Sequence, residues 1–243
     1  LNIIFIALSS YITPNFAIFS LFYFYLFLKS INLKRIIILL LFINIILAAP
    51  AFIYYYINDF YIFKVNVLTD VKNQIKYNLA NKFLIILSLL FFYSLPIFLK
   101  LKFNDLSNSF GKLYVPIILF LICCFLFNFP AGFGGGLFYH FSNKILGNNY
   151  IFFTICLIAT ILFNSVRFYT SNNLILFFCL ILFNPQLSIY HKYFDPLIYF
   201  SIFLLFDHDN KSFIFSNKAV HYLFYFLYAF FLIISLFKSI IIY

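Results

Sequence analysis

The sequence predicts an all-α fold: a polytopic transmembrane helical bundle of about seven to eight transmembrane helices. We expect residues 1–243 to form a single integral membrane domain. Hydrophobic residues make up 65% of the chain and charged residues 9%, which leaves too few polar side chains to cover a water-soluble globule. The apolar residues also occur in long runs, several of which reach the roughly 17–25 residues of one helical membrane crossing.

The first apolar run is interrupted by a proline turn. The chain begins at Leu1 inside that run and contains no Met, so we expect an N-terminally truncated fragment. At Tyr11–Asn15 (Tyr-Ile-Thr-Pro-Asn) the proline lacks an amide donor and keeps the preceding residue out of helical conformation. We therefore expect one helix to end at Ser10 and the next to cover Phe16–Leu28, followed by the basic connection Lys29–Arg35.

The later apolar segments predict further membrane spans because they contain few or no ionisable side chains. These segments are Ile36–Ile57, Phe83–Leu99, Leu113–Phe129, Tyr150–Phe163, Leu174–Phe183, Leu197–Phe206 and Val220–Ile242. Polar connections separate them, the longest being Asn58–Asn81. Pro116 falls in the first turn of its helix, where proline is tolerated, and Pro130 is expected to end that helix.

The distribution of Lys and Arg predicts the orientation of the bundle. If Lys29–Arg35 is cytoplasmic, alternate connections on that side carry nine Lys and Arg residues, against six on the other side. Four of those six lie in one long connection, which has little weight in the positive-inside rule. The sequence therefore predicts a multi-pass protein of the inner (plasma) membrane. The turn at Pro14, the Gly-rich segment Ala131–Gly136 and the polar cluster His191–Asp195 would then share the non-cytoplasmic face.

Charge and cysteine content limit the possible partners. The net charge of +10 comes from Lys and Arg scattered through short connections, which indicates a lipid bilayer as the partner and no nucleic acid. All four Cys lie inside apolar runs, where free Cys packs as a small hydrophobe. Adjacent side chains at Asp207–Asp209 cannot all face one ion. We predict no cofactor and no metal ligands, and leave the need for a divalent metal open.

The segment Asn184–Pro196 is the strongest candidate for chemistry. Its Asn-Pro-Gln break frees backbone carbonyls, and non-helical backbone near membrane depth persists only where protein or a water-filled cavity covers it. His191, Lys192 and Asp195 then supply a proton-transfer group, a cation and a carboxylate within five residues, beside a spanning segment where ionisable groups are expensive. The competing interpretation is an ordinary interfacial loop with solvated charges and an aromatic belt.

The Gly-rich segment Ala131–Gly136 is a second candidate, since it holds four of the six glycines. Its backbone at Gly134 and Gly135 could approach a ligand closely or bind an anion through exposed amides. It matches neither the phosphate loop nor the dinucleotide fingerprint. The competing interpretation is a flexible re-entrant loop, with Tyr139 and His140 on an amphipathic edge beside it.

Few residues could act as a general base, because the chain contains six Asp and no Glu. On the non-cytoplasmic side the base must be Asp59, Asp70 or Asp195, or one of His140 and His191, unless it lies upstream of the present chain.

Two segments resemble the C-terminal part of a C-type (GT-C) membrane glycosyltransferase. They are Tyr-Ile-Thr-Pro-Asn at residues 11–15, and Asn-Pro-Gln at residues 184–186 followed by Ile-Tyr-His-Lys-Tyr-Phe-Asp-Pro at residues 189–196. The resemblance implies transfer of a sugar from a polyprenyl-phosphate-linked donor to a lipid-linked or cell-surface acceptor. The catalytic carboxylate of such enzymes usually lies in the first extracytoplasmic loop, which precedes the part that this chain resembles.

The resemblance also implies roles for individual residues. Asp195 would orient a hydroxyl, His191 and Lys192 would contact the donor phosphate, and Tyr193 would line the sugar pocket. We accordingly predict Asp195 and His191 as catalytic residues. The predicted substrate-binding residues are Asn184, Gln186, Tyr190, Lys192, Tyr193, His140, Gly134 and Gly135.

Two alternatives from other classes stay open. The chain could be a transporter, flippase or polymerase-like membrane protein for isoprenoid-linked glycans, in which the break at Asn184–Gln186 would interrupt a helix at the substrate site. It could also be a membrane scaffold without a ligand. An acidic residue in an early extracytoplasmic loop would favour transfer chemistry, and a matching broken helix would favour transport.

Overall fold

The computed structural model describes residues 4, 8, 14–30, 34–57, 79–99, 113–165, 168–183, 189, 191–207 and 217–242. Within this part of the chain the named elements are all helices, and strand pairing is limited to one isolated bridge between Gly134 and Ile189. The predicted all-α class is therefore confirmed.

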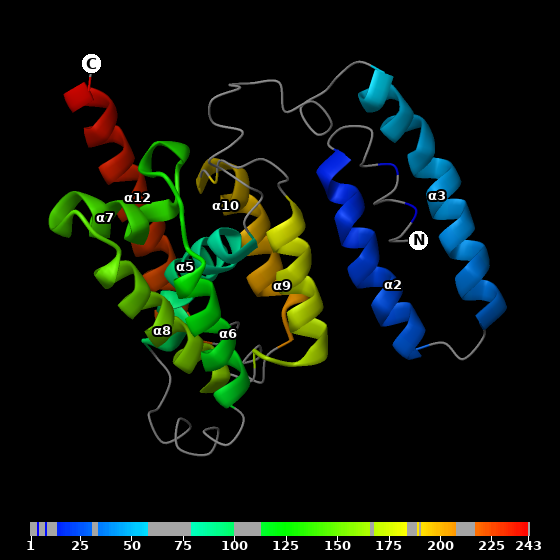
Figure 1. Ribbon diagram of the computed structural model, residues 1–243, viewed down its shortest axis with the longest axis horizontal. Helices are drawn as coiled ribbons and strands as arrows, with labels where there is room; N and C mark the ends of the chain where they lie inside the picture. Colours follow the sequence, from blue (N-terminus) through cyan, green and yellow to red (C-terminus); the bar gives the residue numbers. More distant parts are fainter. Residues whose placement is uncertain are drawn as a thin grey trace.

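The helices follow one another with short connections over much of the chain (Figure 1). In order they are η1 (Pro14–Ile18), α2 (Phe19–Ser30), α3 (Lys34–Ile57), α5 (Leu79–Phe98), α6 (Tyr114–Phe125), η4 (Ala131–Phe133), α7 (Gly136–Leu146), α8 (Tyr150–Ser165), α9 (Ser171–Phe183), α10 (His191–Phe200), η5 (Ser201–Leu205) and α12 (Lys218–Ile242). The segment η5 is a π-helix that directly continues α10.

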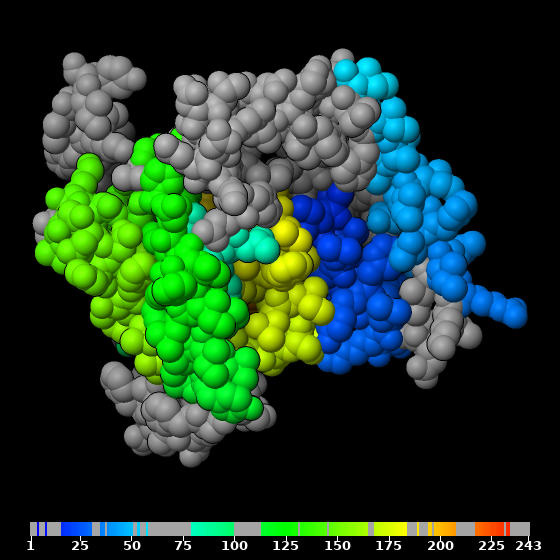
Figure 2. All heavy atoms as spheres, in the orientation of Figure 1, coloured from blue at the N-terminus to red at the C-terminus, as the bar shows by residue number. Residues whose placement is uncertain are grey.

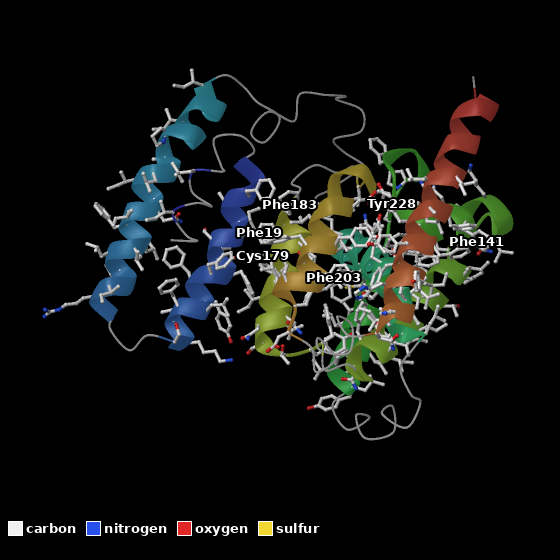
Figure 3. All side chains as sticks on the ribbon, turned by 180° about the vertical axis from the view of Figure 1, so that it is seen from behind. Phe19, Phe141, Cys179, Phe183, Phe203 and Tyr228 are labelled. Carbon is white, nitrogen blue, oxygen red and sulfur yellow. The ribbon has the colours of Figure 1, made fainter. Side chains whose placement is uncertain are left out.

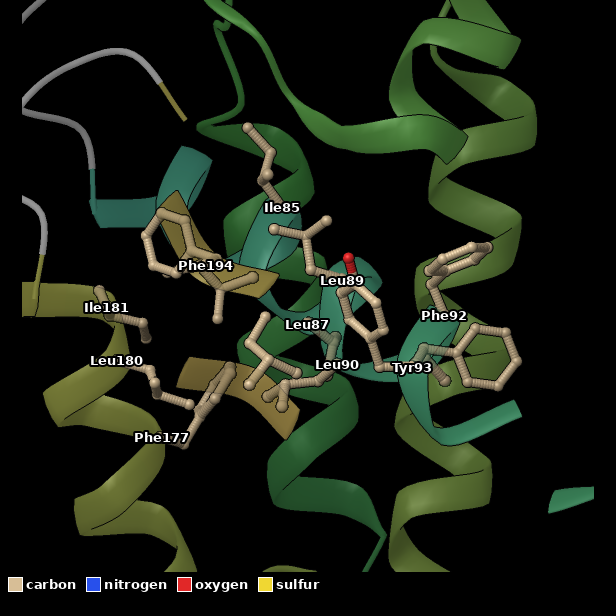
Figure 4. Close-up of a cluster of buried hydrophobic side chains, with 14 of the residues drawn as sticks. Ile85, Leu87, Leu89, Leu90, Phe92, Tyr93, Phe177, Leu180, Ile181 and Phe194 are labelled. Carbon is tan, nitrogen blue, oxygen red and sulfur yellow. The ribbon is translucent and has the colours of Figure 1, made fainter. Parts of the chain in front are cut away.

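Helix α5 is the centre of the molecule, and it packs against α6, α7, α8, α9, α10 and α12. Its sequence is apolar on all sides, the pattern of a helix that is buried all round. No residue from Leu84 to Leu90 exposes more than 1% of its surface. Figure 4 shows its leucines facing Phe177 and Leu180 of α9, with Phe194 of α10 beside Ile85.

Among the residues that the structure describes, α5 is the one helix both long and apolar enough to cross a membrane, and most of it is buried inside the molecule. Shorter apolar helices of 10–17 residues cover Phe16–Ser30, Ile38–Pro50, Tyr114–Phe125, Tyr150–Asn164 and Ser171–Phe183. The full lengths of α3 and α12 are 24 and 25 residues, or about 36–38 Å at 1.5 Å per residue. The expected seven to eight spans therefore remain a prediction.

Helices α2 and α3 extend the molecule to one side, with α2 packed along α9 and α3 packed along α2 (Figure 1). The Phe19 and Phe183 rings lie 5.7 Å apart at the α2–α9 contact. The Cys179 thiol lies 3.6 Å from the Ile18 carbonyl (Figure 3). The 3-10 turn η1 begins at Pro14 and continues directly into helix α2.

Helix α6 is shorter than the predicted span Leu113–Phe129, because it ends at Phe125 rather than at Pro130. A side chain of α5 replaces the lost helical hydrogen bonds. The Asn81 amide donates to the Asn128 carbonyl and accepts from the Asn128 N–H, both at 2.8 Å. Asn81 was expected in a polar connection, and it is instead 3% exposed inside α5. A buried peptide group needs such partners wherever it leaves a helix.

A second buried asparagine makes the same pairing elsewhere. Asn173, the third residue of α9, donates to the Asp207 carbonyl at 2.5 Å and accepts from the Asp207 N–H at 2.7 Å. Asp207 follows η5, where the chain leaves helical conformation. In both places an amide side chain near the start of one helix holds the backbone just beyond the end of another.

The predicted polar loop up to Pro196 is partly helical, because α10 begins at His191. Phe194, Ile198 and Ile202 recur at helical spacing and are all buried, so one apolar face of this segment packs inward. Asp195 consequently lies on a helix, one residue after the first of these apolar anchors. The prediction that the helix starts at Leu197 was wrong because the inward packing extends further toward the N-terminus than the apolar run does.

Candidate functional site

The Gly-rich segment lies against the start of the α10 region. The Gly135 N–H donates to the Ile189 carbonyl at 2.9 Å, and the Ile189 N–H donates to the Phe133 carbonyl at 2.9 Å. These two bonds join segments that are far apart in sequence. The expected proximity of the Gly-rich segment to the polar cluster is confirmed.

The proline turn reaches the same end of the bundle. The Phe16 ring of η1 lies 5.3 Å from Phe183 at the end of α9, and Phe183 lies 6.1 Å from Phe194 in the first turns of α10. The end of α9 therefore links the proline turn to the start of α10, and the Gly-rich segment contacts Ile189 just before that start. The side of the membrane on which they lie stays a prediction.

The backbone conformation and close packing at position 135 require a glycine. Its φ is +112°, and a Cβ at this position would lie 2.3 Å from a ring carbon of Tyr139. The Tyr139 hydroxyl donates to the Phe129 carbonyl, and burial raises the pKa of this phenol, which keeps it a neutral donor. The Gly135 amide is engaged with Ile189, and the proposed substrate contact at Gly134 and Gly135 stays a prediction. His140 is half-buried, its ring 5.9 Å from that of Tyr139.

Asp195 is joined to the central helix by a hydrogen bond from Tyr93. The Tyr93 hydroxyl of α5 donates to the Asp195 carboxylate. Tyr93 is fully buried and Asp195 is half-buried. A hydrogen bond to a charged acceptor is about twice as strong as a neutral one, so this contact fixes the orientation of the carboxylate.

Two further tyrosines complete a tyrosine–aspartate cluster, which we define as Tyr93, Asp195, Tyr199 and Tyr228. Tyr199 follows Asp195 by one turn of α10, and its ring meets that of Tyr93 edge-on with centroids 4.7 Å apart. Tyr228 of α12 lies near both Tyr93 and Tyr199. Three helices, α5, α10 and α12, therefore contribute to one polar site (Figure 3 labels Tyr228).

The sequence did not single out these tyrosines, because the chain contains 20 of them. Tyrosines at the ends of apolar runs are typical of an interfacial belt. Tyr93 lies well inside its apolar run, where a phenol normally needs a hydrogen-bond partner. The position of Tyr93 inside an apolar run was therefore the one feature of the sequence that could have indicated a buried hydrogen bond.

The segment after Asp195 contains two buried hydroxyl groups without hydrogen-bond partners among the described residues. The Tyr199 hydroxyl and the Ser201 hydroxyl are both buried and have no hydrogen-bond partner among the described residues. Leaving such a group unpaired costs about 1–3 kcal/mol. Ser201 starts the π-helix η5, and π-helical turns occur frequently at functional sites.

The cluster lies beside an apolar surface of α12. Tyr228 is 52% exposed. Other large side chains of α12 are exposed as well, namely Tyr222, Tyr225, Phe226, Phe230, Leu232 and Ile233. The cluster thus includes a half-exposed residue of a helix whose exposed surface is suited to hydrocarbon.

Other predicted site residues are placed only in part. His191, Lys192 and Tyr193 form the first turn of α10, with only their backbone described. Positions 191 and 195 have the i, i+4 spacing of neighbours on one helix face. Asn184, Gln186 and Tyr190 lie outside the described residues. Within the described part of the chain, no group of three or more His, Cys, Asp or Glu residues could hold a metal ion.

Comparison with known proteins identifies no relative. No protein-family model matches the chain, and no curated protein or solved structure matches it significantly.

Proposed function

We propose that the chain is a multi-pass membrane protein. The support is the amount of apolar surface on its outer helices. On α6, which crosses one face of the molecule in Figure 2, the exposed large side chains are Tyr114, Val115, Ile118, Leu119, Leu121, Ile122, Phe125 and Leu126. Soluble monomers rarely expose contiguous apolar patches beyond a few hundred Å². Lipid would cover these faces, and α5 would form the protein-covered centre of the bundle.

Within that membrane protein, we propose a glycosyltransferase that moves a sugar from a polyprenyl-phosphate-linked donor to a lipid-linked or cell-surface acceptor. The carrying observation is the Asp195 carboxylate, oriented by Tyr93 in a cluster that also includes the half-exposed Tyr228 of α12. An amphiphilic substrate could present its head group to the carboxylate while its tail stays in lipid.

The proposed chemistry needs one base. Asp195 accepts the proton of the acceptor hydroxyl while the acceptor oxygen bonds to the sugar C1. The bond from C1 to the donor phosphate oxygen breaks, and the polyprenyl phosphate leaves with that electron pair. His191 and Lys192, at the start of the same helix, are the proposed partners of the departing phosphate, since a cation there offsets its charge.

The test measures sugar transfer in membrane vesicles that contain the full chain. Asp195→Asn and Lys192→Ala should abolish transfer from a polyprenyl-phosphate hexose, with unchanged protein levels in the membrane. Tyr114→Phe, on the exposed surface of α6, is the matched control and should retain transfer. Unchanged glycan products in both site variants would remove Asp195 and Lys192 from the proposed site.

A second candidate function is movement of an isoprenoid-linked glycan across the membrane, as in a transporter, flippase or polymerase-like protein. The observation that favours it is the irregular helix after Asp195, where α10 passes into the π-helix η5. Interrupted helices frequently form substrate sites in transporters. Proteoliposomes that move a fluorescent lipid-linked glycan between leaflets, and transfer no sugar, would favour this function.

The proposed orientation has its own test. We expect Cys at position 192 to react with a membrane-impermeant maleimide added from the non-cytoplasmic side. Lys102→Cys, in a connection predicted to be cytoplasmic, should react only after the membrane is opened. Labelling of position 192 from the cytosol alone would place the site on the opposite face.

A further inference from the structure

The tyrosine–aspartate cluster offers two hydrogen-bonding groups of opposite kind. An ionised carboxylate only accepts hydrogen bonds and has about four acceptor positions, one of which, on Oδ1 of Asp195, receives the Tyr93 hydroxyl. The Tyr199 phenol both donates and accepts, and its buried hydroxyl has no partner among the described residues. The cluster is therefore suited to a ligand group that can donate to Asp195 and accept from Tyr199.

An alcohol hydroxyl is such a group, because it donates one hydrogen bond and accepts others. A phosphate would be repelled by the carboxylate, and an ammonium group could not accept a hydrogen bond from Tyr199. The group that reaches this position is thus a neutral hydroxyl of the ligand, at a distance from any phosphate.

The surroundings indicate how the ligand arrives. Tyr228 lies near Tyr199 on the α12 side and is half-exposed, and the exposed surface of α12 is apolar. A free sugar gains nothing from such a surface, whereas a sugar on a hydrocarbon tail can bury its tail there.

We propose that Asp195 and Tyr199 together bind a hydroxyl group of the sugar of a lipid-linked substrate, with Tyr93 as the positioning residue that orients the carboxylate. This inference rests on the proposed function and assigns the sugar-recognition position within the site. It adds Tyr199, which the resemblance did not indicate.

The experiment compares two ligands that differ only in the sugar. The purified full chain in detergent is heated with a thiol-reactive dye, which reports unfolding through the buried thiols of Cys123, Cys156 and Cys179. We measure the increase in Tm given by a polyprenyl-phosphate hexose and by the bare polyprenyl phosphate. In the wild type the hexosyl lipid should raise Tm more than the bare lipid does.

Tyr199→Phe should abolish the difference between the two ligands and weaken the apparent Kd for the hexosyl lipid about tenfold. Its Tm without ligand should rise slightly rather than fall, because the lost hydroxyl is buried and has no partner among the described residues. The control Tyr114→Phe, on the exposed surface of α6, should behave as the wild type. A full sugar-dependent shift in Tyr199→Phe would overturn the inference.

A second measurement varies the ligand. Hexosyl lipids that each lack one sugar hydroxyl should include one whose wild-type shift falls to that of the bare lipid, and that deletion should have no added effect in Tyr199→Phe. Equal shifts for all the deoxy ligands would overturn hydroxyl recognition and leave lipid-phosphate binding intact. No shift with any ligand in the wild type would overturn the proposed function itself.

Discussion

Tyr93 and Asp195 are 102 residues apart in the sequence and are joined by a hydrogen bond between the central helix α5 and helix α10. Through this bond the most buried helix of the molecule orients the single acidic residue of α10. The other aspartates of the chain lie, by sequence, in the polar connections between apolar runs. Position and orientation of this carboxylate are thus set by the core.

Removing the Tyr93 hydroxyl should weaken both function and stability. Tyr93→Phe leaves the ring packing against Tyr199 and deletes the donor to Asp195. We expect sugar transfer to fall by tenfold or more, and the free energy of unfolding to fall by about 1.5–3 kcal/mol, the range for a hydrogen bond to a charged group. Transfer assays and denaturant titration in mixed micelles measure the two effects, with Tyr114→Phe on the exposed surface of α6 as the control. Wild-type values in both assays would contradict the role given to Tyr93.

The buried Asn173 of α9 should contribute far more to the free energy of unfolding than the neighbouring Asn172. Asn173→Ala leaves the Asp207 N–H and carbonyl without their side-chain partner, and we expect a loss of about 1–3 kcal/mol in the free energy of unfolding. Asn172→Ala removes an exposed contact from Lys29 at 3.3 Å and should change stability by less than about 0.5 kcal/mol. Denaturant titration of both variants checks this. Equal losses would show that the Asn173 pairing contributes no special stability.

Two glycines of the same segment should respond differently to a methyl group. Gly135→Ala forces a Cβ into the Tyr139 ring at a positive φ, and should destabilise the fold by more than about 2 kcal/mol. At Gly132 nothing lies within 4 Å of an added Cβ, so Gly132→Ala should be tolerated. Size-exclusion profiles in detergent and Tm distinguish the two. A stable Gly135→Ala variant would mean that Tyr139 moves aside without loss.

Two buried serines form a further matched pair. The Ser201 hydroxyl has no partner among the described residues, so Ser201→Ala should raise the free energy of unfolding by about 1 kcal/mol. The Ser88 hydroxyl donates to the Ile85 carbonyl at 2.7 Å, so Ser88→Ala should lower it by about 0.5–1.5 kcal/mol. The same titration measures both. A loss of stability in Ser201→Ala would indicate a partner for that hydroxyl in the folded protein.

Much of the helical architecture was predictable because the apolar runs are long and clearly bounded. The prediction for Ile36–Ile57 matches α3 within two residues at its start, and Tyr150–Phe163 and Val220–Ile242 match α8 and α12 as closely. The C-terminal end of α6 and the start of α10 were missed. Their positions depend on Asn81 and on inward packing of α10, and neither leaves a signal in local hydropathy.

The candidate site was predictable in part. Asp195 was identified from the sequence because acidic residues are scarce. The alternation of predicted spans placed its segment on the same face as the Gly-rich segment, which contacts Ile189 in the structure. Tyr93, Tyr199 and Tyr228 were not identified, because a tyrosine in an apolar run looks the same whether its hydroxyl faces lipid, a carboxylate or nothing. Burial and the partner are properties of packing between helices.

The sequence by itself determined the helical class, most helix boundaries and the apolar character of the surface, because these depend on runs of neighbouring side chains. Tertiary structure alone decided which helix became the covered centre, and which hydroxyls reached Asp195. The physical reason is that runs of similar hydropathy are interchangeable to a bilayer, whereas hydrogen bonds between distant polar groups are satisfied only in one particular packing of the helices.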